Sequence, residues 1–245
     1  MKRTFADLHL RLNPKDPVVA SRIVAKAATL GYGLVAVPFS SETRDDDEEA
    51  KLRRACADAG VDFASRVDLQ PRNREQLMNQ LRKLRRRFEV VCVSCESKEV
   101  ARQAAKDRRV DLLSFPLIDY TRRFFDRAEA ELACQSFAAL EVDVKPLFLL
   151  EGSVRARFFS TLRREVSVAR EFRVPVVVSS GAASEMLLRK PREIAALAGL
   201  FGLDEALGLD AVSVNPVAIV GRNREKLSSG FVAPGIRVVK EGNDC

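Results

Sequence analysis

Asp7 and His9 are the first residues of the chain whose types and spacing could do chemistry. They lie two positions apart in the strand-like segment Thr4 to Leu10, so their side chains are expected to face the same side of that strand. Metal-dependent hydrolysis of phosphoesters uses such a pair at a strand end, together with several further His, Asp or Glu ligands. His9 is the only histidine among the 245 residues, however, so a site built from several histidines is excluded.

Carboxylates near other expected strand ends leave a second kind of metal site open. Asp7, Asp68, Glu141 and Asp143 would suit a Mg²⁺ ion that is bound by oxygen ligands alone. Isolated carboxylates in such places more often cap loops or pair with arginine. The chain also lacks the G-x-S-x-G, G-x-x-x-x-G-K-[ST] and G-x-G-x-x-G motifs. We therefore assign no catalytic residue, metal ligand or cofactor from the sequence.

The segment Val174 to Ala182 combines a buried strand with small polar residues. Its three consecutive valines favour a strand that is covered on both faces, as in a parallel sheet. Ser179, Ser180 and Gly181 then leave backbone N–H groups free at the carboxyl end, where α/β proteins place their ligand sites. Ser179 and Ser180 are thus candidate contacts for a phosphate group. Two other interpretations stay open: the segment only forms a turn into the next helix, or it binds the phosphate of a small metabolite.

The elements that must position these residues alternate between strand-like and helix-like segments, which indicates repeated βα units around a parallel sheet. We expect an α/β fold of the TIM-barrel-like (β/α)₈ type, with residues 1–240 forming a single domain and residues 241–245 a short frayed tail. Residues 230–239 are expected to form an extra strand or a packed extension. The eight expected strands are Thr4 to Leu10, Leu34 to Phe39, Asp62 to Leu69, Val90 to Cys95, Asp111 to Phe115, Leu140 to Val144, Val174 to Ser179 and Ala211 to Val214.

The composition restricts the class of protein. The formal net charge is +7, and 30 of the 41 basic residues are arginine, which favours phosphate or RNA as a partner. Five scattered cysteines, an odd number, argue against a disulfide framework. No apolar run is long enough for a membrane span or a signal peptide, so we expect a cytoplasmic protein with no membrane partner.

Three groups of cations are candidate phosphate contacts, although ordinary solvated faces would carry the same residues. The first group is in the third expected helix, where an apolar stripe leaves Arg82, Lys83 and Arg86 on the solvent side. The second group, Arg155 and Arg157, is near the start of a later expected helix that runs from Ser153 to about Phe172. The third group, Arg222 and Arg224, follows the last expected strand.

Four passages, in this order and spacing, resemble one protein family. They are Phe5 to His9, Asp111 to Pro116, Val174 to Ala182, and Asn223 to Leu227 leading into Pro234 to Val238. The chain resembles the TIM-barrel-like protein subunit of archaeal and eukaryotic ribonuclease P, the protein component 3 family. That family is itself similar to metal-dependent phosphoesterase barrels, but it lacks the metal ligands of those enzymes.

The resemblance implies a protein that supports a catalytic RNA in removing the 5′ leader from precursor tRNA and does not itself hydrolyse RNA. It also implies a small ferredoxin-like partner subunit and other ribonuclease P proteins. RNA contacts are then predicted among Arg82, Lys83, Arg86, Arg155, Arg157, Ser179, Ser180, Arg222 and Arg224. A metal-dependent phosphoesterase that uses Asp7 and His9 is the alternative function.

Overall fold

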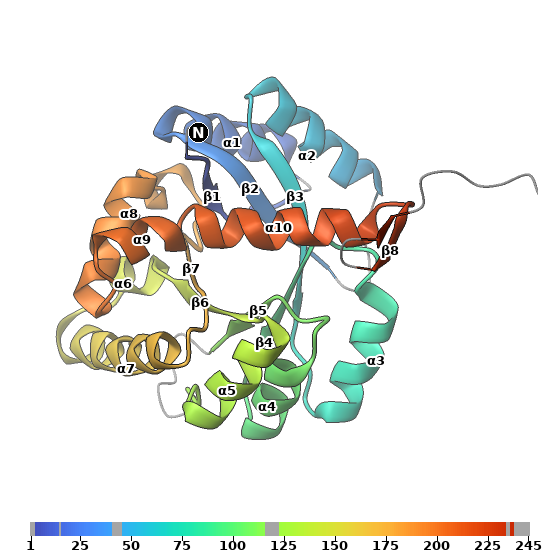
Figure 1. Ribbon diagram of the computed structural model, residues 1–245. Coiled ribbons are helices and arrows are strands. Elements are labelled where there is room, and N and C mark those ends of the chain that lie inside the picture. The colour runs from blue at the N-terminus through green and yellow to red at the C-terminus, as the bar shows by residue number, and fades with distance from the viewer. Residues whose placement is uncertain (1–2, 15, 41–45, 116–122, 234–235, 238–245) are drawn as a thin grey trace, which may run out of the picture.

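Parallel strands dominate the computed structural model, which describes residues 3–14, 16–40, 46–115, 123–233 and 236–237. Within this part of the chain, seven strands form one sheet in sequence order, and each pairs in parallel with the next (Figure 1). The strands are β1 (Phe5–Asp7), β2 (Tyr32–Phe39), β3 (Asp62–Leu69), β4 (Val90–Ser94), β5 (Leu112–Ser114), β6 (Ala139–Asp143) and β7 (Val176–Ser179). The sheet curls into a nearly closed barrel, which confirms the predicted fold class.

Helices surround this sheet (Figure 1). They are α1 (Pro17–Leu30), α2 (Asp46–Asp58), α3 (Arg74–Leu84), α4 (Lys98–Lys106), α5 (Arg127–Ser136), α6 (Lys145–Leu149), α7 (Gly152–Glu171), α8 (Pro191–Ala198), α9 (Glu205–Ala211) and α10 (Val214–Leu227). Helix α1 begins and ends at residues typical of helix ends: the Asp16 side chain accepts a hydrogen bond from the Val19 amide, and Gly31 ends the helix with a positive φ of 97°. In the described residues, no helix combines the length and the apolar character that a membrane crossing requires.

Apolar side chains of the strands alternate between two layers, because successive residues point to opposite faces. In β2, Val35 and Val37 face the outer layer between sheet and helices, while Leu34 and Ala36 face the barrel interior. The same alternation separates the two cysteines of the C-x-x-C, since Cys92 lies inside the barrel and Cys95 outside it. This period of two therefore divides the apolar core into an inner and an outer layer.

The predicted eighth strand is wrong. Residues 211–214, all of which the structure describes, contain the end of α9 at Ala211 and the start of α10 at Val214. Pro216 gives a physical reason, because proline suits the first turn of a helix and cannot donate a hydrogen bond to a strand ladder. One backbone hydrogen bond, from the Ala6 amide to the Val212 carbonyl at 2.9 Å, occupies the place of the missing strand beside β1.

The predicted extension after Gly230 is a small hairpin apart from the barrel. Strand β8 (Phe231–Ala233) pairs in antiparallel fashion with β9 (Ile236–Arg237). Residues 234–235 and 238–245 of the expected extension and tail lie outside the described residues. The first predicted strand is also shorter than expected, since β1 ends at Asp7.

Helix α10 runs across the amino-terminal end of the barrel (Figure 1). Ile219 and Val220 enter the inner apolar layer. Polar side chains of the helix bind carbonyl groups at the starts of strands: Asn215 Nδ2 donates to Val176 O at 2.8 Å, and Asn223 Nδ2 donates to Glu89 O at 2.7 Å. The helix thus closes the end of the barrel that a (β/α) fold does not use for ligands.

Replacing Asn223 tests this closure. Asn223→Ala removes a buried amide that satisfies the Glu89 carbonyl, so we expect the free energy of unfolding to fall by about 1–3 kcal/mol. The matched variant Asn79→Ala removes an exposed amide on α3 and should change it by less than about 0.5 kcal/mol. Urea denaturation measures both, and equal effects would contradict a closing role for α10.

Candidate functional site

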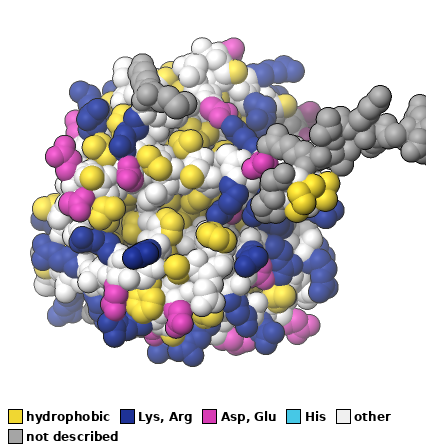
Figure 2. Space-filling view, viewed as in Figure 1, with side chains coloured by type: hydrophobic (Ala, Val, Ile, Leu, Met, Phe, Trp, Pro, Cys, Tyr) yellow, Lys and Arg dark blue, Asp and Glu magenta, His cyan; other side chains and the backbone are white. Residues whose placement is uncertain are grey.

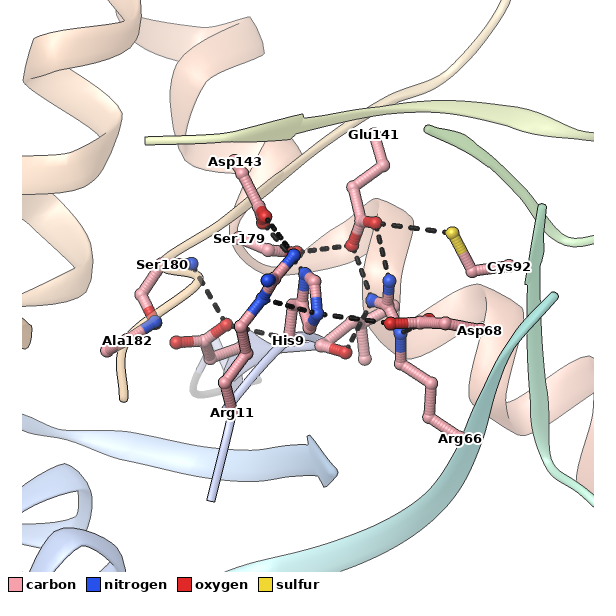
Figure 3. Close-up of polar contacts among 12 residues, drawn as sticks. His9, Arg11, Arg66, Asp68, Cys92, Glu141, Asp143, Ser179, Ser180 and Ala182 are labelled. Carbon is pink, nitrogen blue, oxygen red and sulfur yellow. Dashed lines mark hydrogen bonds and ion pairs between the residues drawn. The ribbon is translucent and has the colours of Figure 1, made fainter. Parts of the chain in front are cut away.

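Charged side chains from several strands meet at the carboxyl end of the barrel (Figure 3). They come from the end of β1 and the residues after it, from β3, from β6, and from the end of β7 and the residue after it. The cluster, which we call the mouth network, consists of Asp7, His9, Arg11, Arg66, Asp68, Glu141, Asp143, Ser179 and Ser180. The strand-end residues that the sequence singled out are therefore brought together.

Arg66 is the centre of the mouth network and its side chain is completely buried. Its two terminal nitrogens bind the two carboxylate oxygens of Glu141 at 2.6 and 2.7 Å, and Nε donates to Asp68 Oδ1 at 2.6 Å. Nη1 also donates to the Leu8 carbonyl at 2.7 Å. Burial by itself would lower the pKa of this guanidinium, but Asp68 and Glu141 outweigh burial and raise it, so Arg66 is a permanent internal cation.

His9 lies between two carboxylates. Nδ1 is 3.0 Å from Asp143 Oδ1, and Nε2 is 3.2 Å from Asp68 Oδ2. Burial and the Arg66 charge oppose protonation, yet Asp143 and Asp68 raise the pKa of the imidazole to about 9. Arg11 Nε also lies 3.1 Å from Nε2. Nε2 can accept this hydrogen bond only when the ring is neutral, whereas the protonated ring donates from Nε2 to Asp68 instead.

Asp7 fixes the backbone on both sides of the gap between β1 and β7. Its Oδ1 accepts hydrogen bonds from the amides of His9 and Ser180, each at 3.1 Å. Burial raises the pKa of this carboxyl group. Its second oxygen, Oδ2, is buried and has no hydrogen-bond partner among the described residues.

Three of the four carboxylates of the mouth network are paired with its cations. Three carboxylates, those of Asp68, Glu141 and Asp143, face three cations, which are Arg66, protonated His9 and Arg11. Gly181 allows this packing, because a Cβ atom there would lie 3.0 Å from Asp143 Oδ2 at a positive φ of 63°. Apart from Asp7, the charged side chains of the network are therefore paired with one another.

Internal contacts already engage the side chains of this network that could hold a divalent metal ion. One ligand atom from each of His9, Glu141 and Asp143 lies within 4.8 Å of the others, a spacing compatible with a metal. However, both oxygens of Glu141 are bound to Arg66, and His9 Nδ1 lies 3.0 Å from Asp143 Oδ1, so a metal ion would have to displace these contacts. The guanidinium inside the ring of carboxylates already supplies the positive charge that a metal would bring.

Ser179 and Ser180 are buried within this network and are not free at the strand end. Ser179 Oγ donates to Glu141 Oε1 at 2.8 Å. Ser180 donates its amide to Asp7, and its Oγ accepts from the Ala182 amide at 3.0 Å. The Ser180 amide and the hydroxyl groups of both serines are thus engaged inside the protein.

The predicted cations fall into two kinds. Exposed residues on α3 and just after it, and at the start of α7, make up the first kind; these are Arg82, Lys83, Arg86, Arg155 and Arg157. Arg222 and Arg224, on α10, are the second kind and lie at the opposite end of the barrel from the mouth. Arg224 binds Asp62 and Glu89, while Arg222 lies 3.3 Å from Asp111. They hold α10 to the residues at the starts of the strands.

Sequence reasoning missed Arg66 and Arg11. Arg66 stands two residues before Asp68 in an expected strand, so the two share a face, and a cation on the inward face of a barrel strand was the available signal. Its partner Glu141 is 75 residues away in sequence, which no local pattern reveals.

The class of protein that these features define is a TIM-barrel-like α/β domain whose mouth is filled by its own ion pairs. The family model described as RNase P subunit p30 matches residues 4–228, and the chain belongs to this family. Ribonuclease P protein component 3 of Methanosarcina acetivorans is 32% identical over 243 residues, and that of Methanosarcina barkeri is 30% identical. Each match covers 99% of this chain and 98% of the relative.

Solved structures share the fold. A chain in the cryo-EM structure of archaeal ribonuclease P with mature tRNA has a TM-score of 0.85 and 18% identity, and the match covers 98% of this chain and 100% of that one. A lactonase from Listeria monocytogenes is more distant, with a TM-score of 0.52 and 10% identity over 89% of this chain and 94% of the other.

Removing Arg66 should expose the cost of the carboxylates that it neutralises. Arg66→Met leaves Glu141 buried and unpaired, so we expect the free energy of unfolding to fall by about 3–5 kcal/mol. Adding Glu141→Met should restore part of that loss. Arg127→Met, which breaks the exposed pair with Glu171, is the control and should cost less than about 1 kcal/mol. Additive losses in the double variant would contradict the central role of the pair.

His9 should make stability depend on pH. The pKa of its imidazole is about 9 in the folded chain and about 6.5 in the unfolded chain, so the folded state binds the proton more tightly. Its contribution, about 3 kcal/mol, is complete below about pH 6.5 and is lost as the pH rises through 9.

The single histidine makes this measurement direct. Its ring protons should titrate by NMR near pH 9, and the pH dependence of urea unfolding between pH 6.5 and 9 should be weaker in His9→Asn. A ring that titrates at or below pH 6.5 would contradict the ion pairs with Asp68 and Asp143.

Proposed function

We propose that this chain is a protein subunit of ribonuclease P that helps the catalytic RNA remove the 5′ leader from precursor tRNA. The observation that carries the proposal is family membership over residues 4–228, together with relatives of the same length that are named ribonuclease P protein component 3. The fold shared with a chain of archaeal ribonuclease P supports it.

The chemistry of the barrel mouth agrees with a supporting role. His9 is paired with Asp68 and Asp143, and both oxygens of Glu141 are bound to Arg66, so these side chains are engaged within the protein and are not presented to a phosphodiester. We therefore place the contribution of this chain in binding and the chemistry in the RNA.

Binding rests on the exposed cations. Four exposed cations have no ion pair within the part of the chain that the structure describes: Arg82, Lys83, Arg86 and Arg155. Arg157 is also exposed and lies on α7 with Arg155. Such side chains neutralise phosphates and release counterions, which lets RNA segments that repel each other come together.

The remaining predicted contacts rank below these five. Arg222 and Arg224 already hold carboxylates, so they would contact RNA only with the outer part of the guanidinium. Ser179 and Ser180 are buried and bonded internally. The proposed order of importance is therefore the exposed cations of α3 and α7, then those of α10, and last the two serines.

The proposed partners are ribonuclease P RNA, a small ferredoxin-like protein subunit and other ribonuclease P proteins, with precursor tRNA reached through the complex. The proposed location is the cytoplasm. Purification of the tagged chain from cells, with and without ribonuclease treatment, should show one RNA and one small protein that co-purify, and the RNA should disappear after treatment.

Charge reversal on and just after α3 tests the binding surface. The triple variant Arg82→Glu, Lys83→Glu, Arg86→Glu should weaken binding of the chain to ribonuclease P RNA about tenfold or more at 0.15 M salt and lower the salt slope by about two to three. Reconstituted cleavage of precursor tRNA should fall accordingly.

The matched control carries the same charge change elsewhere. Lys26→Glu, Lys51→Glu and Arg54→Glu reverse three exposed cations on α1 and α2. If this control weakens binding as much as the α3 variant does, the effect comes from net charge and the α3 surface is not the contact. A log–log salt slope shallower than about two for the unaltered chain would count against RNA binding itself.

A further inference from the structure

A second feature of the basic surface lies where α10 ends and the β8–β9 hairpin begins. A pocket of about 470 Å³ opens there, beside the residues that follow α3. Figure 2 shows hydrophobic and basic side chains side by side over this end of α10. The pocket is lined by Arg86, Lys226, Leu227, Ser228, Phe231 and Val232, none of which is acidic.

The two cations of this pocket lack counter-ions. Neither Arg86 nor Lys226 makes an ion pair with any residue that the structure describes, and both are exposed. Partial burial and the charges of Arg222, Arg85 and Arg108 lower the pKa of the Lys226 ammonium, although Asp111 opposes this. The local potential is positive, which favours an anionic ligand.

Phe231 gives the pocket an aromatic wall. Its ring is half-buried and belongs to neither of the two apolar clusters of the barrel, so core packing does not account for it. Arg86 comes from the chain after α3, Lys226 from α10 and Phe231 from β8, which means that three separate elements converge here. A volume of about 470 Å³ is in the range of pockets that hold a ligand of nucleotide size.

We propose that this pocket binds one unpaired nucleotide of an RNA, with its phosphate between Arg86 and Lys226 and its base against the ring of Phe231. The inference rests on the proposed function, because it assumes that the chain binds RNA. An aromatic ring next to paired cations is the arrangement by which proteins hold single-stranded nucleic acid. An acidic protein segment would use the cations and leave the stacking surface without a role, and it is an outcome of the test.

Tryptophan fluorescence tests the stacking directly, since the chain contains no tryptophan. In the full chain, Phe231→Trp introduces a single indole into the pocket. A ten-nucleotide uridine RNA should quench its emission, because a base that stacks on the indole quenches it, whereas abasic RNA of the same length should not. Phe148→Trp, in α6, is the control and should show little quenching.

Two further variants separate this pocket from the α3 surface. Phe231→Leu should weaken binding of the uridine RNA about tenfold, and Phe231→Tyr should keep most of it. Lys226→Gln should lower the salt slope by about one. Lys26→Gln on α1 is the matched control and should leave the slope unchanged.

The outcomes decide between the two proposals. If ribonuclease P RNA binds the unaltered chain but does not quench the Phe231→Trp emission, and Phe231→Leu binds normally, the nucleotide pocket is overturned and the proposed function stands. Equal quenching by RNA and abasic RNA would overturn base stacking. A blue shift caused by a co-purified protein, with no quenching by RNA, would assign the pocket to a protein partner. Failure of the chain to bind any RNA would overturn both proposals.

Discussion

The buried pair of Arg66 and Glu141 is the interaction on which the barrel mouth depends. A single guanidinium in β3 binds a carboxylate in β6, a second carboxylate in its own strand and a carbonyl after β1, so it ties together strands that are not neighbours in the sheet. Burying such charges is costly, and only full pairing offsets that cost. The two-point contact with Glu141 meets this condition and also fixes the orientation of the guanidinium.

An internal cation changes what the carboxylates of the mouth can do. In a barrel with free carboxylates and a neutral imidazole, this position would attract metal ions from solution. Here the Arg66 side chain supplies the positive charge, and Asp143 and Asp68 keep His9 protonated. Paired side chains therefore fill the carboxyl end of the barrel, and the net charge of +7 is carried by the outer surface.

Sequence patterns predicted the barrel well because its strands are buried on both faces and its helices begin and end at recognisable residues. Seven of the eight predicted strands are present in the described residues, and the strand-end carboxylates Asp7, Asp68, Glu141 and Asp143 were anticipated as a group. The segment at Ala211 failed because four apolar and small residues suit a helix junction as well as a strand. Arg66 was missed because its meaning depends on a partner in another strand, and distant pairing leaves no local signal.

The sequence also does not show which arginines hold the fold and which stay exposed. Arg85 and Arg86 are adjacent in sequence, yet Arg85 binds Asp111 and the Phe88 carbonyl, whereas Arg86 is exposed and lines the pocket beside α10. Arg224 likewise looks like part of a surface patch in the sequence but ties α10 to Asp62 and Glu89. The guanidinium group suits both tasks, because a carboxylate and a phosphate present the same pair of oxygens. Only the internal partners separate an arginine that holds the fold from one that stays exposed, and by that criterion the proposed RNA contacts are the exposed cations of α3, of α7 and of the end of α10.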